Sequence, residues 1–395
     1  MEIVVVMSFA LSFSLLIEKR IHIPKPIFHI LVLLGVLIGI GFIVSLFSSH
    51  ELYDVIRDII HFSKPFLLIF SGFLLLRKIN DTSFFIKVVV YVSLLFAVKH
   101  LFVLATSTYV RGTIEELRLL AGGGNFIEVI GLLFLYVFYK NPILNITRST
   151  KMIFMAIIAI SIFFYFSRTS LLAILILFLS VYGYTILSRK AFEYSIFGVV
   201  VLGLLYGYLY TQDLDPDKKG IENFFYKIKN APAEVFTTPK GYDPNNHKEI
   251  FDHWRGYEAM MALRKMEEDQ WSYVFGKGFG SLIDLGFKAP IGGEDGLRYI
   301  PHFHNGYVYI FFKTGAIGIF FYLLIMYSMY KRGYVFADSD TAKIMNRLIS
   351  GMGLYFIITT FVITGLYNLG EISVFLTGCF YGLSYKIKEN TKIHG

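Results

Sequence analysis

Long apolar runs recur along almost the whole chain, and several approach the roughly 20 residues that cross a bilayer as a helix. Hydrophobic residues make up 55% of the 395 residues, whereas charged residues make up only 17%. Because lipid offers no partner for free backbone polar groups, such runs cross a membrane as helices. The sequence therefore predicts an all-α, polytopic membrane protein.

The apolar runs predict about eleven transmembrane helices, and their loose edges also allow twelve. The run at the start has no basic leader and no small-residue cleavage site, so we expect it to be a retained span. The runs lie near residues 2–17, 26–48, 60–76, 84–105, 125–139, 152–167, 170–187, 194–210, 305–330, 347–366 and 370–385.

Basic residues are concentrated in every second loop between these runs. Since Lys and Arg hold loops in the cytoplasm, the pattern predicts an external N-terminus and a cytoplasmic C-terminus. It also places residues 211–303 outside, as one large and mostly helical loop. This loop separates an N-terminal bundle of about eight helices (1–210) from about three C-terminal helices (304–395).

Charge and cysteine content exclude several classes of protein. The net charge is +8, but the external loop holds 12 Lys and Arg against 15 Asp and Glu, so the basic surplus lies elsewhere. No compact basic patch carries a nucleic-acid-binding motif, so we expect no nucleic-acid partner. The single Cys379 excludes a disulfide framework. No zinc-protease, Walker or Asp-rich external motif is present, so we predict no metal and no cofactor.

The most informative stretch runs from Tyr299 to Gly318, where the polar loop gives way to an apolar run. His302, His304 and Asn305 stand at this border. An imidazole there can exchange a proton near neutral pH, and it would suit a substrate whose tail stays in lipid. The competing interpretation is an interfacial histidine that only caps a helix.

Two arginines are candidates for binding phosphate. Arg168 lies in a short hinge between two apolar runs, and Arg255 lies on an expected external helix. A guanidinium binds phosphate oxygens in a bidentate way. For Arg168 an anchor to lipid headgroups is the alternative, and for Arg255 it is a solvated surface charge.

Further candidates surround these residues. Trp254 and Tyr257 flank Arg255 on the apolar side of the expected helix, and Arg111 and Arg118 lie in an external loop that is able to cover a substrate. We list all four as substrate-binding candidates together with His302 and Asn305. For the two loop arginines, contact with lipid headgroups is the competing interpretation. Charged residues inside spans are functional candidates by default, but a structural ion pair is the preferred interpretation for Glu128 and Lys313.

The order of these motifs resembles the O-antigen ligase/polymerase superfamily, which comprises Wzy-like polymerases and WaaL-like ligases. The resemblance covers roughly residues 120–330. It is carried by a Ser-Arg-Thr hinge, a Trp-Arg pair, a Gly-x-Gly-Phe-Gly turn and a His-Asn followed by Gly-x-x-Gly. These motifs are Ser167–Thr169, Trp254–Arg255, Gly276–Gly280, His304–Asn305 and Gly315–Gly318.

The resemblance implies a C-type (GT-C-like) glycosyltransferase fold in the bacterial inner membrane, with a periplasmic active site. It implies metal-independent transfer of a glycan from undecaprenyl pyrophosphate, with His304 as the catalytic histidine and Arg168 and Arg255 as pyrophosphate binders. His302, two residues before His304, is a departure from the family pattern, and we expect it either to support His304 as a neighbouring partner or to share its acid–base role. A flippase and a chain-length regulator are the expected protein partners.

Three branches of function fit the resemblance. We favour polymerisation of lipid-linked O-antigen or polysaccharide repeat units, and the alternatives are ligation of the glycan to lipid A-core and transfer of glycan to protein. The alternative from another class is a transporter or flippase of the same lipid-linked sugars, for which Lys99, Glu128 and Lys313 would line a path.

Overall fold

The computed structural model is mostly helical. It describes residues 10, 13–14, 23–79, 81–106, 122–214, 221–236, 253–289, 296–337, 339–368 and 372–394. Among these, six helical segments are long and apolar enough to cross a membrane, which supports a multi-pass membrane protein. They are Lys25–Ser45, Leu52–Lys78, Thr82–Thr106, Ala191–Thr211, Gly306–Tyr334 and Asp340–Ile363.

Helices occur at the predicted positions from residue 26 onward. The first predicted span, 2–17, lies largely outside the described residues, so the total of eleven stays a prediction. The observed helices are α2 (Lys25–Ser45), α3 (Leu52–Lys78), α4 (Thr82–Thr106), α6 (Asn125–Val137), α7 (Arg148–Phe164), α8 (Arg168–Tyr182), α9 (Arg189–Thr211), α14 (Gly306–Tyr330), α15 (Asp340–Ile363) and α16 (Ser373–His394).

Helix α3 begins at Leu52, eight residues before the predicted start of its span. Polar residues interrupt the apolar pattern in this first part, so hydropathy alone placed the boundary too late. Asp54 pairs with Arg57 at 2.8 Å, and Asp58 pairs with Lys313 at 2.6 Å. Because these charges are neutralised, the helix keeps them within the protein at a much reduced cost.

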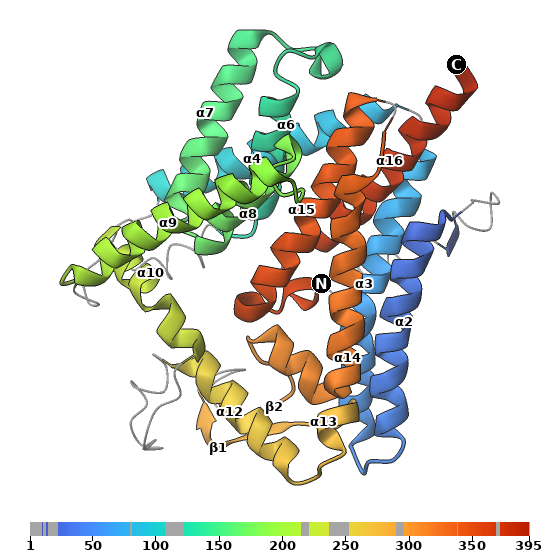
Figure 1. Cartoon of the computed structure of the whole chain (residues 1–395), viewed down its shortest axis with the longest axis vertical. Helices are drawn as coiled ribbons and strands as arrows, with labels where there is room; N and C mark the ends of the chain where they lie inside the picture. Colours follow the sequence, from blue (N-terminus) through green and yellow to red (C-terminus); the bar gives the residue numbers. More distant parts are fainter. Residues whose placement is uncertain are drawn as a thin grey trace. The chain divides into compact units, whose positions relative to one another are not determined.

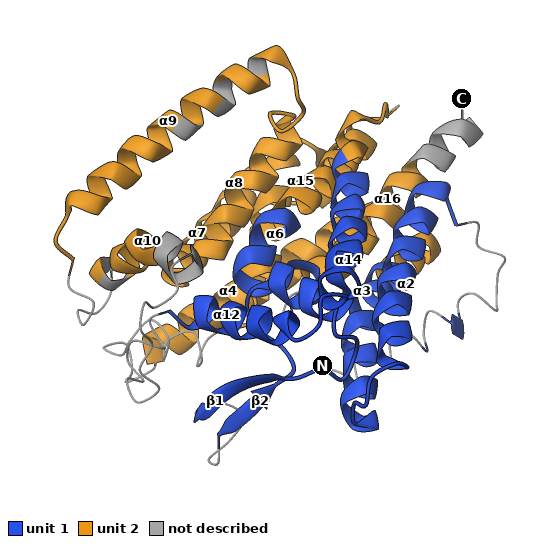
Figure 2. Cartoon of the chain, turned by 60° about the horizontal axis from the view of Figure 1, so that its bottom comes forward, with its two compact units in different colours: residues 1–71, 231–330, 356–369 blue, residues 72–230, 331–355, 370–395 orange. Residues whose placement is uncertain are grey.

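The chain forms two compact units by its internal contacts (Figure 2). Unit 1 comprises residues 1–71, 231–330 and 356–369, and unit 2 comprises residues 72–230, 331–355 and 370–395. The predicted division at 1–210, 211–303 and 304–395 concerns membrane topology, and it stays a prediction.

Within unit 1, the helices α2, α3 and α14 lie side by side (Figure 1). The described part of residues 211–303 adds α12 (Trp254–Glu267), the short α13 (Ser272–Phe275), and two strands, β1 (Ile283–Ala289) and β2 (Leu297–Ile300). The helix α10 (Ile221–Phe236) precedes them in the chain.

The strands β1 and β2 form an antiparallel pair, which the prediction of a mostly helical loop had missed. The sequence carries the signal for it, because apolar residues alternate with Asp, Gly and Lys from Ile283 to Ala289. Such period-two alternation indicates a strand. The Gly-Gly dipeptide at 292–293 supplies the turn signal between the two strands, although it lies outside the described residues.

A break in α14 fixes the turn that follows α13. Gly315 has φ 65° and ψ −167°, so the helical hydrogen bonds are interrupted there. The backbone N–H groups of Lys277 and Gly278 donate to the carbonyls of Phe312 (2.7 Å) and Lys313 (3.1 Å). Gly276 also has a positive φ, and a Cβ on it would lie 2.4 Å from the Lys313 backbone. The Gly-rich turn therefore docks on the break by backbone contact.

Unit 2 contains its own buried polar cluster, among α4, α6 and the end of α7. The Tyr165 hydroxyl donates to Glu128 Oε1 at 3.0 Å, and its ring stacks on His100 at 3.7 Å between centroids. The His100 Nδ1 atom lies 2.8 Å from the Ser161 hydroxyl. Tyr165 thus holds Glu128, whose ion pair stays a prediction, whereas the predicted ion pair of Lys313 is confirmed by its contact with Asp58.

Candidate active site

His304 is held by one carboxylate, that of Glu258. The Nδ1 atom of His304 lies 3.0 Å from Glu258 Oε2, and the His304 backbone N–H donates to the same oxygen at 2.8 Å. The side chain of Glu258 is 2% exposed and that of His304 is 53% exposed. Because an ionised carboxylate only accepts hydrogen bonds, the contact keeps a proton on Nδ1 and leaves the lone pair of Nε2 free to act as a base.

Helix α12 brings Glu258 to this position, and Tyr257 anchors the helix. Tyr257 is 1% exposed, and its hydroxyl donates to the Leu285 carbonyl on β1. Its ring also packs against Trp254 and Phe287. This placement favours packing roles for Tyr257 and Trp254, although both were predicted to bind substrate.

Asn305 places His304 directly before a helix. The Oδ1 atom of Asn305 accepts from the Val308 N–H at 3.3 Å, and its carbonyl accepts from the Tyr309 N–H at 2.9 Å. Asn305 is thus the cap of α14, as this residue type favours at a helix start. The cap fixes the chain direction at His304. This structural role explains the presence of Asn305 without a contact to substrate.

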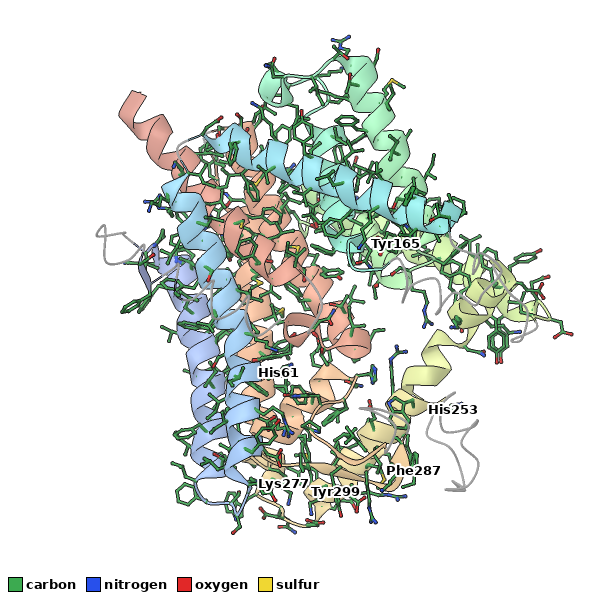
Figure 3. All side chains as sticks on the ribbon, turned by 180° about the vertical axis from the view of Figure 1, so that it is seen from behind. His61, Tyr165, His253, Lys277, Phe287 and Tyr299 are labelled. Carbon is green, nitrogen blue, oxygen red and sulfur yellow. The ribbon has the colours of Figure 1, made fainter. Side chains whose placement is uncertain are left out.

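His302 belongs to a second cluster, in which one hydroxyl bridges two imidazoles. The Tyr309 hydroxyl lies 3.0 Å from Nδ1 of His302 and 2.9 Å from Nδ1 of His61, a residue of α3 that Figure 3 labels. The two imidazole rings are 4.2 Å apart between centroids. We name His61, Tyr309 and His302 the His–Tyr–His cluster.

The imidazole of His302 is neutral over the physiological pH range. Burial is the largest cause that lowers the pKa of His302 to about 2, and nearby His61 and Lys313 add to the effect. His302 therefore differs from an ordinary histidine, whose pKa of about 6.5 lets it exchange protons near neutral pH. The predicted sharing of the acid–base role between His302 and His304 is not favoured by this environment.

A buried ion pair adjoins the cluster in unit 1. Lys313 and Asp58 are both 0% exposed, and the Lys313 ammonium also donates to the Ser281 carbonyl at 2.5 Å. The Gly280 N–H donates to Asp58 Oδ2 at 2.7 Å. The pair thus ties α3, α14 and the Gly-rich turn together, which is a structural role.

A cavity of about 290 Å³ lies between His304 and the His–Tyr–His cluster. It is lined by His61, His302, Phe303, His304, Tyr309, Ile363, Thr364, Tyr367 and Asn368. His304 thus faces a cavity within unit 1 while Glu258 supports it from α12.

The predicted arginines occupy different places. Arg255 is three residues before Glu258 on α12, so both residues share the helix face that meets His304. Arg168 belongs to unit 2, where it is the first residue of α8 and donates to the Lys227 carbonyl at 2.5 Å. Arg111 and Arg118 lie outside the described residues. No group of three or more His, Cys, Asp or Glu that could hold a metal ion occurs in the part of the chain that the structure describes.

Glu258, His61 and Tyr309 are site residues that sequence reasoning missed. A usable signal existed for His61, because Asp54, Asp58 and His61 recur at helical spacing in an apolar run. Glu258 carried a weaker one, its spacing of three from Arg255. A tyrosine in a chain with 27 of them carried none.

Comparison with known proteins gives one family. Residues 153–323 match the family model described as O-antigen ligase. No curated protein and no solved structure matches the chain. The matched region contains Arg168, Arg255, Glu258, His302 and His304, whereas His61 lies before it. Residues 153–323 are thus similar to the O-antigen ligase family, which is consistent with the O-antigen ligase/polymerase superfamily that the motifs resemble.

Proposed function

We propose that the protein is a membrane glycosyltransferase that polymerises repeat units carried on undecaprenyl pyrophosphate. The observation that carries the proposal is the contact between Glu258 and His304, two residues of the family-matched region, because it leaves a free imidazole nitrogen beside a cavity. We place the site at the periplasmic face of a GT-C-like fold in the inner membrane, with the N-terminus outside and the C-terminus in the cytoplasm.

The chemistry is a substitution at the anomeric carbon of the donor sugar. The acceptor hydroxyl oxygen forms a bond to this carbon, and the bond from the carbon to the pyrophosphate oxygen breaks. The hydroxyl proton passes to Nε2 of His304, and undecaprenyl pyrophosphate leaves with the electron pair. General base catalysis of this kind requires the lone pair that Glu258 leaves free.

Cationic groups are needed for the leaving group, because negative charge builds up on its oxygens. We assign Arg255 and Arg168 to this role. A guanidinium binds two phosphate oxygens at once and stays charged at all physiological pH values. Fixed donors of this kind lower the barrier most when they are in place before the reaction.

Ligation of the glycan to lipid A-core uses the same donor and the same base, so it remains the alternative within the family. A flippase is the alternative from another class. It depended in part on Lys313 as a residue of the translocation path, and this ammonium is already bound to Asp58 and Ser281.

The test uses purified protein and the lipid-linked glycans extracted from cells that lack the gene. A ladder of products on a gel, absent from His304→Ala and retained in the exposed control His29→Ala, is the expected result. Transfer that requires lipid A-core would identify a ligase. A fully active His304→Ala protein, or lipid scrambling without transfer, would overturn the proposal.

A further inference from the structure

The cavity beside His304 carries polar groups but no charged side chain among its described lining residues. It offers imidazole, hydroxyl and amide groups from four segments of unit 1. A pyrophosphate needs cations, whereas these groups suit the hydroxyls of a sugar. The cavity volume of about 290 Å³ is near the lower end for ligand sites, so it suits one sugar ring rather than an oligosaccharide.

Two buried polar atoms of this lining have no hydrogen-bond partner within the described part of the chain. They are Nε2 of His61 and the hydroxyl oxygen of Tyr367, on residues that are 4% and 2% exposed. Buried polar groups in folded proteins are nearly always hydrogen-bonded, so each exception needs an explanation. A ligand with hydroxyl groups in the cavity would supply the missing partners.

The His–Tyr–His cluster also fixes which hydrogen bonds the two histidines can offer. The Tyr309 hydroxyl carries one proton, so it can donate to only one of the two Nδ1 atoms that contact it. The other Nδ1 must carry a proton and donate to the hydroxyl oxygen. With both rings neutral, one histidine then presents Nε2–H as a donor, and the other presents Nε2 as an acceptor.

Neutrality of both rings follows from their surroundings. The environment of His302 lowers its pKa to about 2. His61 is 4% exposed, and the groups that interact with its ring, the Tyr309 hydroxyl and the Tyr367 backbone, carry no charge, so a proton added there would bury an unpaired charge. One donor and one acceptor side by side match a sugar hydroxyl, which both donates and accepts.

We propose that this cavity binds one sugar residue of the acceptor glycan, and that the His–Tyr–His cluster recognises a hydroxyl of that residue while His304 deprotonates another. The inference rests on the proposed function, and it adds His61, Tyr367 and the cluster as residues that select the acceptor. It assigns the cavity to the acceptor because the pyrophosphate end of the donor requires the arginines, neither of which lines it.

The experiment measures glycan transfer to a labelled free acceptor whose concentration is varied. The lipid-linked donor is held at a low fixed concentration, because in a polymerase it also competes as an acceptor. The donor is the lipid-linked glycan extracted from cells that lack the gene. The acceptor is the repeat unit released from that lipid by mild acid, or lipid A-core oligosaccharide if wild type accepts only that.

We expect the KM for acceptor to rise about three- to tenfold in His61→Gln, His302→Gln and Tyr367→Phe, because each variant loses about one hydrogen bond to the acceptor. The KM for donor should stay within about twofold of wild type, as should both values for the exposed control His29→Gln. If wild type is active and all three variants keep its acceptor KM, the assignment is overturned. A rise in the donor KM alone would also overturn it.

A second measurement keeps the proposal falsifiable if a variant does not fold. In full-length protein labelled with ¹⁵N at histidine, the signals of His61 and His302 should show one ring protonated at Nδ1 and the other at Nε2. Two rings in the same tautomer would contradict the cluster. Absence of any transfer by wild type would instead contradict the proposed function, so the two failures are distinguishable.

Discussion

One carboxylate, that of Glu258, holds His304 through both its backbone N–H (2.8 Å) and its Nδ1 atom (3.0 Å). The two residues are 46 positions apart, so the contact joins α12 to the segment that enters α14. It sets both the position and the tautomer of the imidazole.

The first prediction concerns this contact. Glu258→Gln should lower kcat by about 10²-fold or more, because an amide can also donate and no longer enforces the tautomer with a free Nε2. The KM for acceptor should change little. The measurement is steady-state transfer with both substrates varied.

The matched control for Glu258 is the double variant Glu258→Gln/His304→Ala. Since the carboxylate acts through the imidazole, this variant should be no slower than His304→Ala alone. A further loss of rate in the double variant would show that Glu258 has another role.

The second prediction concerns the buried ion pair. Lys313→Met should lower the free energy of unfolding by about 3–5 kcal/mol, because it leaves Asp58 charged and unpaired at 0% exposure. Lys313→Met/Asp58→Asn should recover much of the loss. Thermal unfolding in detergent measures both, and equal melting temperatures of the single and double variants would contradict the pair's structural role.

The third prediction concerns the docking of the Gly-rich turn on α14. Gly315→Ala should destabilise the protein by at least about 2 kcal/mol, because the residue has a positive φ and the new Cβ would meet the Val274 carbonyl at 2.2 Å. Gly35→Ala is the control, since nothing lies within 4 Å of a Cβ there. In that helix the change should be neutral or stabilising by up to about 1 kcal/mol. Equal melting temperatures for the two variants would contradict the docking.

The fourth prediction concerns the arginines. Arg255→Ala and Arg168→Ala should each raise the KM for donor and lower kcat, and Arg→Lys should restore only part of the activity because the bidentate geometry is lost. The assay is transfer with the lipid-linked donor varied. Full activity of both lysine variants would argue for simple charge, and full activity of both alanine variants would remove these residues from the mechanism.

The fifth prediction concerns pH. The pKa of His302 is about 2 in the folded protein and about 6.5 in the unfolded chain, so below pH 6.5 the unfolded chain binds a proton that the folded protein does not. The stability is fully present above pH 6.5 and falls as the pH drops from there toward 2. The melting temperature should therefore fall between pH 7.5 and pH 5, and it should fall less in His302→Gln. The same slope in both proteins would contradict the prediction.

Much of the membrane architecture follows from hydropathy. The apolar runs from residue 26 onward each correspond to a helix, because lipid leaves a buried backbone no other partner. The start of α3 was placed too late since its polar residues are paired within the protein, Asp54 with Arg57 of the same helix and Asp58 with a lysine 255 positions away. The β1–β2 pair was missed because a short strand gives a weak signal beside long helices.

For the site, the sequence by itself determined which kinds of groups are present. His304 and Arg168 stand at borders between polar and apolar segments, whereas Arg255 lies on a helix of the polar loop. The motifs of all three resemble those of the family that the comparison found. It did not determine their partners. Hydropathy and motif order are local properties, and they carry no information on which distant side chain faces which.

Only the tertiary structure decided that Glu258 fixes the tautomer of His304, and that Tyr309 joins His61 to His302. It also decided that Lys313 is bound by Asp58 rather than free. The physical reason is that hydrogen bonds and ion pairs act over about 3 Å, and only the packing of α3, α12 and α14 brings these distant residues within that range.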